Sequence, residues 1–437
     1  MLTVRDHYWD KPTPIARTKW HFATDRSGAP RVLLDGGFEP GRLYEVTFKA
    51  TGARVAGVGL AAIRDAASAF RYRTDLPVHG TTVYVQGESQ DGRFLRQFLY
   101  DGFNADERDR RVFDAVWAHI AGSARGTFNQ RFGMPISASV LLTPTTFPFT
   151  TDEQELHGER GSLLQLYKPA QIPKIFFTNT AVEYWGGGRA AALIHTSADG
   201  TRDLPTPGNV RIYLLSSTQH SEAPFPPIRA RGQQLRNTVP QREIMRALLR
   251  GLDGWVRQGT APPESRYPRL ADGTLTPIAS VKFPAIPGVA DPRIIPGPGQ
   301  IRGGNVEMLP HLVPQVDADG NDVAGIRAPD VSVPVATNTG WNFRSESIGG
   351  TREIVNLLGS YIPFARTRSD REVRKDPRLS VQERYRDEND YLAKLRAAAE
   401  ALVKGRYLLP EDVDNVMKRG RSQWQFVAGQ TTTTSSR

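Results

Sequence analysis

The sequence contains no cysteine among its 437 residues. Disulfide bonds, thiolate nucleophiles and cysteine-ligated metal sites are therefore excluded, while the redox compartment stays open. No apolar run approaches the roughly 18 residues that a membrane span requires, and residues 1–12 carry charges in place of the apolar core of a signal peptide. We expect a soluble chain, either cytoplasmic or secreted with its signal removed.

Clusters of a single charge sign are also scarce. Lys and Arg outnumber Asp and Glu by 56 to 46, a net charge of +10, but runs such as residues 107–111 and 366–375 mix both signs. Mixed runs are typical of solvated surface and not of a track for phosphate groups. Nucleic acid is therefore not an expected partner, and the oligomeric state stays open.

Strand-like and helix-like segments alternate over the first 260 residues. β-rich segments stand at 43–50, 81–86, 112–120, 174–178 and 210–216, and helical spacing is found at 59–70, 93–100 and 241–256. This alternation predicts an α/β fold with a mainly parallel central sheet flanked by helices.

The chain divides into four predicted regions. Residues 1–33 form an N-terminal arm, and residues 34–260 form the core. Within the core, residues 127–171 lack periodicity and predict a lid or pocket insert. Residues 261–430 are predicted to form an extension that wraps the core. This region is first rich in Pro and Gly and then has helical spacing at 381–403 and from 409. Residues 431–437 are expected to be a disordered tail.

The sharpest local motif surrounds Ser89. A predicted strand runs into a turn that contains Gly87, Ser89 and Gly92, and a helix follows at once. This order is typical of a nucleophile elbow, in which a strained turn exposes a serine hydroxyl at the sheet edge. The general pattern G-x-S-x-G requires glycine where Asp91 stands. Ser89 could instead cap the helix, so both interpretations stay open on the motif alone.

Two further residues follow later strands in the order that such a serine requires. Glu183 comes after the 174–178 strand and His220 after the 210–216 strand, where catalytic groups gather in open α/β sheets. His220 is the predicted base and Glu183 the predicted acid of a triad. Glu183 could also be an exposed acid at a helix start, and His119 and His195 lie near predicted strands too.

Backbone N–H groups of Gln90 and Val58 are the predicted oxyanion donors, Val58 from the loop after the 43–50 strand. Aromatic residues predict an apolar pocket, although aromatics in loops also serve as packing. These residues are Phe128, Phe132, Phe147, Phe149, Tyr184 and Trp185.

Two motifs for bound groups are rejected. Gly57-Val58-Gly59 loosely matches a dinucleotide loop, but no acidic residue follows convincingly at the ribose-binding distance. Residues 317–322 resemble a calcium loop, but Asp322 and Ala328 stand where glycine and glutamate are required. A glycine-containing β-turn is expected there instead. No cofactor and no metal is expected.

Residues 87–104 resemble the serine segment of a bacterial alpha/beta hydrolase domain family, whose elbow has the form G-x-S-Q-x-G-R-F-L-R. Asp91 followed by Gly92 fits that form. The resemblance covers about residues 34–413 and implies an α/β-hydrolase fold with Ser89 as nucleophile, His220 as base and Glu183 as acid. Further matching segments lie at 119–126, 128–129, 179–180, 183–185, 218–220, 265–268, 313–317 and 360–365.

The expected activity is hydrolysis of carboxylic esters through an acyl-enzyme on Ser89. Its substrate would be a small-molecule or polymeric ester, hydrophobic or aromatic, polyester fragments included. An amidase, lactonase or acyltransferase with the same triad is one alternative. A non-catalytic binding protein on a hydrolase scaffold is another.

Overall fold

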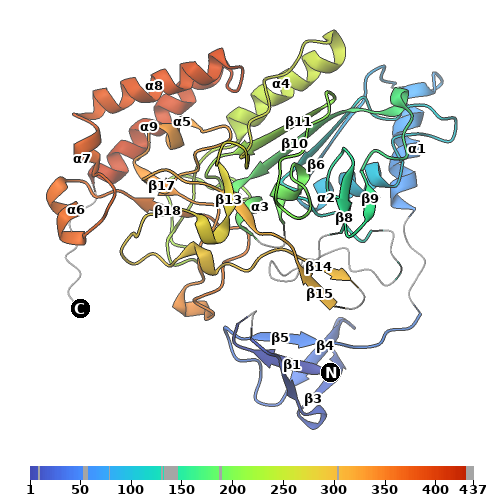
Figure 1. Cartoon of the computed structure of the whole chain (residues 1–437), viewed down its shortest axis with the longest axis horizontal. Helices are drawn as coiled ribbons and strands as arrows, with labels where there is room; N and C mark the ends of the chain where they lie inside the picture. Colours follow the sequence, from blue (N-terminus) through green and yellow to red (C-terminus); the bar gives the residue numbers. More distant parts are fainter. Residues whose placement is uncertain are drawn as a thin grey trace.

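A central sheet with helices on both faces organises the chain (Figure 1). The computed structural model describes residues 1–7, 10–52, 58–77, 79–128, 131, 146–186, 189–302 and 305–429.

The central sheet has the strand order β11-β10-β7-β6, and its pairings are all parallel. Its strands are β6 (Tyr84–Glu88), β7 (Ala115–His119), β10 (Lys174–Thr180) and β11 (Val210–Leu215). Every residue of β7 is buried, as expected for a parallel strand covered on both faces. The predicted α/β class with a parallel sheet is confirmed.

Successive strand residues point to opposite faces, so the sheet has two cores. One core joins Val116 and Phe177 of the sheet to α1 (Gly59–Tyr72) and α2 (Gln90–Tyr100). The other joins Trp117 and Phe176 to α4 (Arg242–Gln258). The apolar stripe expected on α4 is buried there, through Ile244, Leu248, Leu252 and Trp255.

Two long C-terminal helices pack into the core on the α4 side. They are α8 (Glu388–Lys404) and α9 (Val413–Ala428), which lie next to α4 in Figure 1. The single helix expected at 381–403 is two helices, because Asp387 caps a new start by accepting a hydrogen bond from Asp390 N at 2.8 Å. The first piece is α7 (Val381–Arg384). A helix start at Pro410 is confirmed, since a 3-10 turn there leads into α9.

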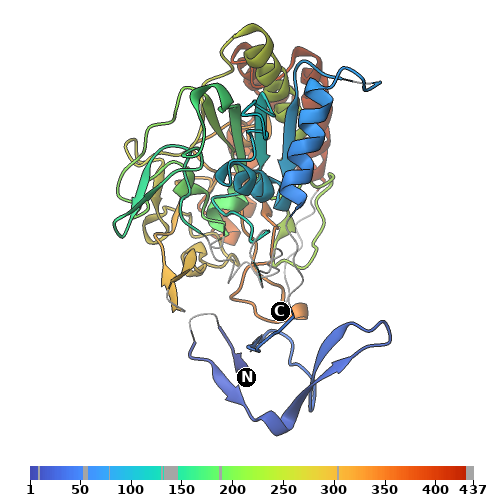
Figure 2. The same ribbon diagram turned by 90° about the vertical axis from the view of Figure 1, so that its right-hand side faces the viewer.

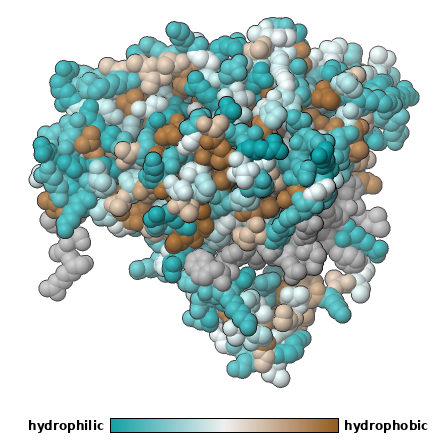
Figure 3. Space-filling model, in the orientation of Figure 1, coloured by the Kyte–Doolittle hydropathy of each residue, from teal (hydrophilic) through white to brown (hydrophobic). Residues whose placement is uncertain are grey.

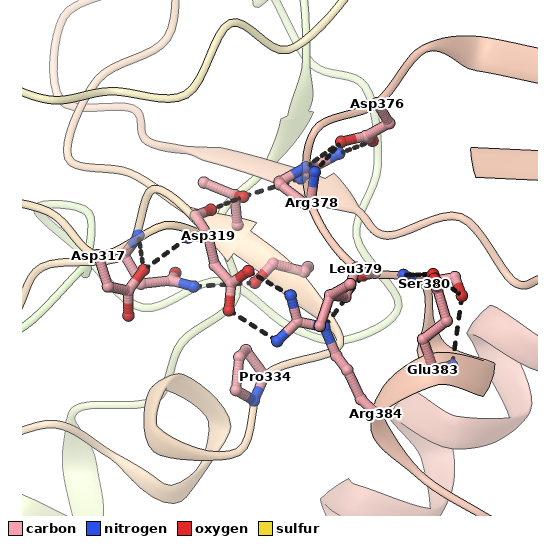
Figure 4. Close-up of polar contacts among 12 residues, drawn as sticks. Asp317, Asp319, Pro334, Asp376, Arg378, Leu379, Ser380, Glu383 and Arg384 are labelled. Carbon is pink, nitrogen blue, oxygen red and sulfur yellow. Dashed lines mark hydrogen bonds and ion pairs between the residues drawn. The ribbon is translucent and has the colours of Figure 1, made fainter. Parts of the chain in front are cut away.

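Polar contacts fasten the segment before α8 to the turn at 317–320 (Figure 4). The Arg384 guanidinium forms an ion pair with Asp319, one contact being 2.8 Å. The turn is closed by Gly320 N donating to Asp317 O at 2.9 Å, and Gly320 has φ +80°, which favours glycine. The expected glycine-containing β-turn is confirmed.

The N-terminal residues form their own small sheets, which lie below the central sheet in Figures 1 and 2. β5 (Leu43–Val46) pairs antiparallel with β1 (Leu2–Arg5), and β1 pairs with β2 (Thr13–Ile15). β3 (Trp20–Thr24) and β4 (Pro30–Leu34) form a hairpin. Residues 43–46 are therefore a strand as expected, but the expectation that they join the parallel series is wrong. Alternation identifies a strand and leaves its pairing partner undetermined.

Short elements complete the described chain. The predicted insert at 127–171 contains the hairpin of β8 and β9, while its residues 129–130 and 132–145 lie outside the described residues, as does the 431–437 tail. These short elements are β8 (Gln154–Leu156), β9 (Glu159–Gly161), α3 (Ala181–Trp185), β12 (Leu235–Arg236), β13 (Leu275–Pro277), β14 (Gly299–Arg302), β15 (Asn305–Met308), β16 (Leu312–Pro314), α5 (Pro329–Ser332), β17 (Ala336–Asn338), β18 (Ser360–Pro363) and α6 (Arg368–Arg374).

Hydrophobic and hydrophilic side chains are interspersed on the face shown in Figure 3, as on most globular surfaces. Among the helices of the described residues, none has the length and apolar character needed to cross a bilayer.

A buried ion pair ties α9 to α5. Arg419 contacts Asp330 at 2.8 and 3.1 Å and Glu243 of α4 at 3.0 Å, and Gln423 donates to Asp330 at 2.6 Å. Asp330 is 5% exposed, so it depends on these partners for its charge to be tolerated in the interior.

Replacing Asp330 with alanine should therefore destabilise the fold by about 3–5 kcal/mol, because Arg419 loses its main counter-charge while it stays buried. The free energy of unfolding in urea measures this loss. Asp414→Ala, at an exposed position of α9, is the matched control and should cost less than about 1 kcal/mol. A similarly small loss of stability for Asp330→Ala would contradict a stabilising role for the Asp330–Arg419 ion pair.

Candidate active site

Ser89 occupies a sharp turn between β6 and α2. Its backbone has φ 56° and ψ −111°, a conformation that costs free energy for a residue with a side chain. Two hydrogen bonds hold the turn, Ser89 N to His119 O at 2.9 Å and Arg93 N to Ser89 O at 3.0 Å. The Ser89 hydroxyl makes no capping hydrogen bond to α2. The helix-cap interpretation of this serine is therefore not supported, and the elbow geometry is present.

Glycines are required on both sides of this turn. A Cβ on Gly87 would lie 2.5 Å from Asp91 O, and a Cβ on Gly92 would lie 2.8 Å from His119 O. Such distances force the backbone to move. The side chain of Asp91 is exposed, so position 91 does not require glycine. This explains why the second glycine stands one residue later than in the general pattern.

His220 bridges Ser89 and Glu183. Its Nε2 lies 2.9 Å from Ser89 Oγ and its Nδ1 lies 2.6 Å from Glu183 Oε1. His220 is 3% exposed. The three residues that the sequence predicted as a group are therefore brought together, from the ends of β6, β10 and β11.

Glu183 uses its two carboxylate oxygens differently. Oε2 accepts hydrogen bonds from the backbone N–H of Thr180, at 2.8 Å, and from the Thr180 hydroxyl, while Oε1 faces His220. Burial alone would raise the pKa of this fully buried carboxyl, but His220, Arg189 and Thr180 hold the pKa below its usual range. Glu183 is thus at a helix start, as the alternative interpretation supposed, but it is buried and not exposed.

The loop that carries His220 is held from the C-terminal half of the chain. Ser217 has φ 55°, and its N–H donates to Asp322 Oδ2 at 2.6 Å while Asp322 N donates to Ser217 Oγ at 2.8 Å. Asn237 Nδ2 donates to Ser217 O at 2.7 Å. These contacts fix the direction in which the imidazole points.

Two other histidines considered from the sequence have different partners. His119 Nδ1 lies 2.8 Å from Thr178 Oγ1, and burial lowers the pKa of His119 to about 4. His195 Nε2 lies 3.0 Å from Tyr184 OH, and burial lowers the pKa of His195 to about 3. Among the described residues, His220 is the histidine whose ring is hydrogen-bonded to Ser89.

The comparison with protein families now decides the relationship. The sequence model of the family described as alpha/beta hydrolase domain matches residues 32–418. The chain belongs to this family. No curated protein and no solved structure matches the chain. The resemblance inferred from residues 87–104 is thus confirmed. Membership in this alpha/beta hydrolase family indicates that the chain is a hydrolase.

The two predicted oxyanion donors of this alpha/beta hydrolase differ in position. Gln90 is the first residue of α2, where backbone N–H groups point away from the helix. Val58 is 80% exposed, and its carbonyl accepts the first bond of α1 from Ala62 N at 2.8 Å. The strand that precedes Val58 in the chain, β5, belongs to the N-terminal sheet and not to the central sheet, so the strand position from which Val58 was predicted as a donor is absent.

The predicted aromatic pocket residues fall into two groups. Phe128 contacts Phe94 of α2 with ring centroids 5.5 Å apart, and Phe94 is close to Ser89 in sequence. Phe132 lies outside the described residues. Tyr184 and Trp185 are 0% and 1% exposed and belong to interior clusters. Their side chains pack in the interior, as does that of Phe149, which contacts Phe147.

Several supporting residues were not identified from the sequence. Thr180 to Glu183 reads T-x-x-E, the capping-box pattern that fixes a carboxylate at a helix start, and this signal could have predicted the orientation of Glu183. Asp322 and Ser217 lie 105 residues apart, and no local pattern joins them. In the described part of the chain, no cluster of three or more His, Asp or Glu residues could hold a metal ion.

Adding a methyl group at position 92 should disturb the elbow. Gly92→Ala places a Cβ 2.8 Å from His119 O and 3.1 Å from the Ala121 Cβ, and such overpacking should lower the free energy of unfolding by about 1–3 kcal/mol. Gly208→Ala meets no atom within 4 Å and serves as the control, expected within about 0.5 kcal/mol of wild type. Equal stability of the two variants would show that the α2 backbone at Gly92 does not pass close to His119 O and Ala121.

Asp322 should make stability depend on pH. Burial raises the pKa of Asp322 to about 7, so the folded chain binds this proton more tightly than the unfolded chain, whose carboxyl titrates near 4. The contribution is fully present below pH 4 and is lost as the pH rises toward 7.

The Asp322→Asn variant removes this titration. Its free energy of unfolding, relative to wild type, should rise between pH 4 and pH 7 by up to ~4 kcal/mol. Denaturant unfolding at several pH values measures the difference. A difference that stays constant over this range would show that Asp322 does not titrate there.

Proposed function

We propose that this alpha/beta hydrolase is a serine hydrolase that cleaves carboxylic esters through an acyl-enzyme on Ser89. The observation that carries the proposal is the continuous chain of hydrogen bonds from Ser89 Oγ to His220, at 2.9 Å, and from His220 to Glu183, at 2.6 Å. A hydroxyl, an imidazole and a carboxylate in this order are the components of nucleophilic acyl transfer.

Acylation begins with His220. Its Nε2 accepts the Ser89 proton as Oγ attacks the ester carbonyl carbon, which becomes tetrahedral with a negatively charged oxygen. The N–H of Gln90, the residue after the nucleophile and the first of α2, is the proposed donor to that oxygen. When the carbon–oxygen bond of the ester breaks, His220 returns the proton to the leaving alcohol. Water then attacks the acyl group, with His220 as base, and releases the acid and free Ser89.

Glu183 supports this proton transfer electrostatically. Its depressed pKa keeps the carboxylate ionised at neutral pH, and an anion 2.6 Å from Nδ1 stabilises the imidazolium that forms during attack. The second oxygen is fixed by Thr180, so the carboxylate cannot rotate away from His220.

Aromatic side chains suggest which esters bind. Phe94 follows Ser89 by five residues on α2 and contacts Phe128 edge-on. This aromatic pair near the start of α2 is the basis for proposing hydrophobic or aromatic acyl groups, polyester fragments included.

Turnover of p-nitrophenyl esters of increasing acyl length tests the proposal. Ser89→Ala and His220→Ala should each lower kcat by about 10⁶-fold, and Glu183→Gln by about 10⁴-fold, because the imidazole loses its correct tautomer. Ser422→Ala and His21→Ala, at exposed positions, are the matched controls and should retain wild-type rates.

Activity that persists in Ser89→Ala would rule out this nucleophile, and near-normal activity in Glu183→Gln would move the acid role to another residue. Matched ester, amide and lactone substrates separate the esterase from an amidase or lactonase, and added alcohol acceptors reveal an acyltransferase. We expect the ester to be turned over fastest. A folded wild-type chain without any turnover would favour a binding protein.

A further inference from the structure

Arg93 carries a charge that nothing in the described protein neutralises. It follows Ser89 by one helical turn on α2, and its Nε is buried without a hydrogen-bond partner. No carboxylate in the described residues forms an ion pair with it. Helical side chains lean toward the helix N-terminus, so the Arg93 guanidinium leans toward the turn that carries Ser89.

Arg189 lies beside Glu183 of the same site. Its Nη1 is 3.9 Å from Glu183 Oε1, a long contact, and its Nε is also buried without a partner. Its backbone is fixed, because Arg189 O accepts hydrogen bonds from Ser123 N at 2.8 Å and Ser123 Oγ at 3.2 Å. The start of α2 packs on the segment that leads to Ser123, since a Cβ on Gly92 would lie 3.1 Å from Ala121 Cβ. The two arginines therefore extend from neighbouring segments, and burial and then repulsion by Arg189 lower the pKa of Arg93.

No undescribed side chain can supply the missing counter-charge. The residues outside the described ranges include no Asp and no Glu. Two neighbouring arginines each donate to backbone carbonyls, although Arg96 Nε, Arg96 Nη1 and Arg125 Nε are buried without a partner. Arg96 donates to Ser123 O at 2.9 Å, and Arg125 donates to Phe147 O at 2.6 Å. Arg93 differs from both, because no group of the described protein accepts a hydrogen bond from it.

A half-buried guanidinium without a partner is costly unless an anion joins it. We propose that Arg93 and Arg189 bind a carboxylate of the substrate, so that the preferred substrates are esters with a free carboxylate, such as monoesters of dicarboxylic acids. This inference rests on the proposed ester hydrolysis. The planar guanidinium suits a carboxylate through paired hydrogen bonds.

The charge count favours a carboxylate over a dianionic phosphate. Arg93 and Arg189 carry two positive charges, and Glu183 beside Arg189 carries one negative charge. The net charge of the three groups is therefore +1, which one carboxylate neutralises. A bound carboxylate would also hold the ester carbonyl at a fixed distance from Ser89 Oγ.

Two p-nitrophenyl esters test this preference. Mono-p-nitrophenyl glutarate carries the carboxylate, and methyl p-nitrophenyl glutarate replaces it with a neutral group of similar shape. Wild type should show a kcat/KM for the acidic ester at least about 10-fold higher, since hydrogen bonds to a charged group are stronger than those to a neutral group. In Arg93→Gln this ratio should fall about 10-fold or more, and Arg93→Lys should lie between.

A net-charge control separates local from bulk attraction. Arg396→Gln removes the same charge from an exposed position of α8 and should leave the ratio as in wild type. A wild-type ratio of one or less, or a ratio that Arg93→Gln leaves unchanged while either ester is hydrolysed, would overturn the carboxylate site and leave the esterase intact.

Glutarate binding provides a readout that does not depend on turnover. Calorimetry at constant ionic strength should detect glutarate binding to wild type and to Arg396→Gln, with about 10-fold weaker affinity or none in Arg93→Gln. If neither ester is hydrolysed, the proposed function fails, and this titration still decides the carboxylate site. Equal affinity in wild type and Arg93→Gln would reject it.

Discussion

The strained turn at Ser89 is the constraint on which the site depends. A serine at φ 56° is held there by the His119 carbonyl at the end of the neighbouring strand and by the first turn of α2. The turn is possible only because Gly87 and Gly92 leave room for the strand and helix backbones to pass closely. In return, the hydroxyl projects from the sheet edge toward His220 instead of capping its own helix.

Parallel strands bring the remaining groups to the same edge. Ser89, Glu183 and His220 follow the ends of β6, β10 and β11, which are near one another because all carboxyl ends of a parallel sheet lie on one side. Each group is then fixed by a local device. The Thr180 cap fixes Glu183, and the Ser217 contacts with Asp322 fix the loop of His220. The geometry of the candidate site therefore depends on both halves of the chain.

The sequence was sufficient where the signal is local. Hydrophobic spacing identified α1, α2 and α4, and the order of Ser89, Glu183 and His220 after three strands anticipated their meeting. Non-local relations were not accessible. The pairing of residues 43–46 with β1 joins residues that are 38 to 44 positions apart in sequence. The interior positions of Tyr184 and Trp185 depend on packing against later segments. The helix break at Asp387 was a local signal, a capping aspartate, that the broader periodicity concealed.

Covalent labelling tests the central claim, an activated Ser89, most directly. A fluorophosphonate reacts with a serine whose proton an adjacent histidine can remove, and peptide mapping by mass spectrometry locates the adduct. We expect one adduct on Ser89 in the wild-type chain and none in Ser89→Ala or His220→Ala. An unlabelled wild-type chain, or an adduct on any other residue, would contradict it.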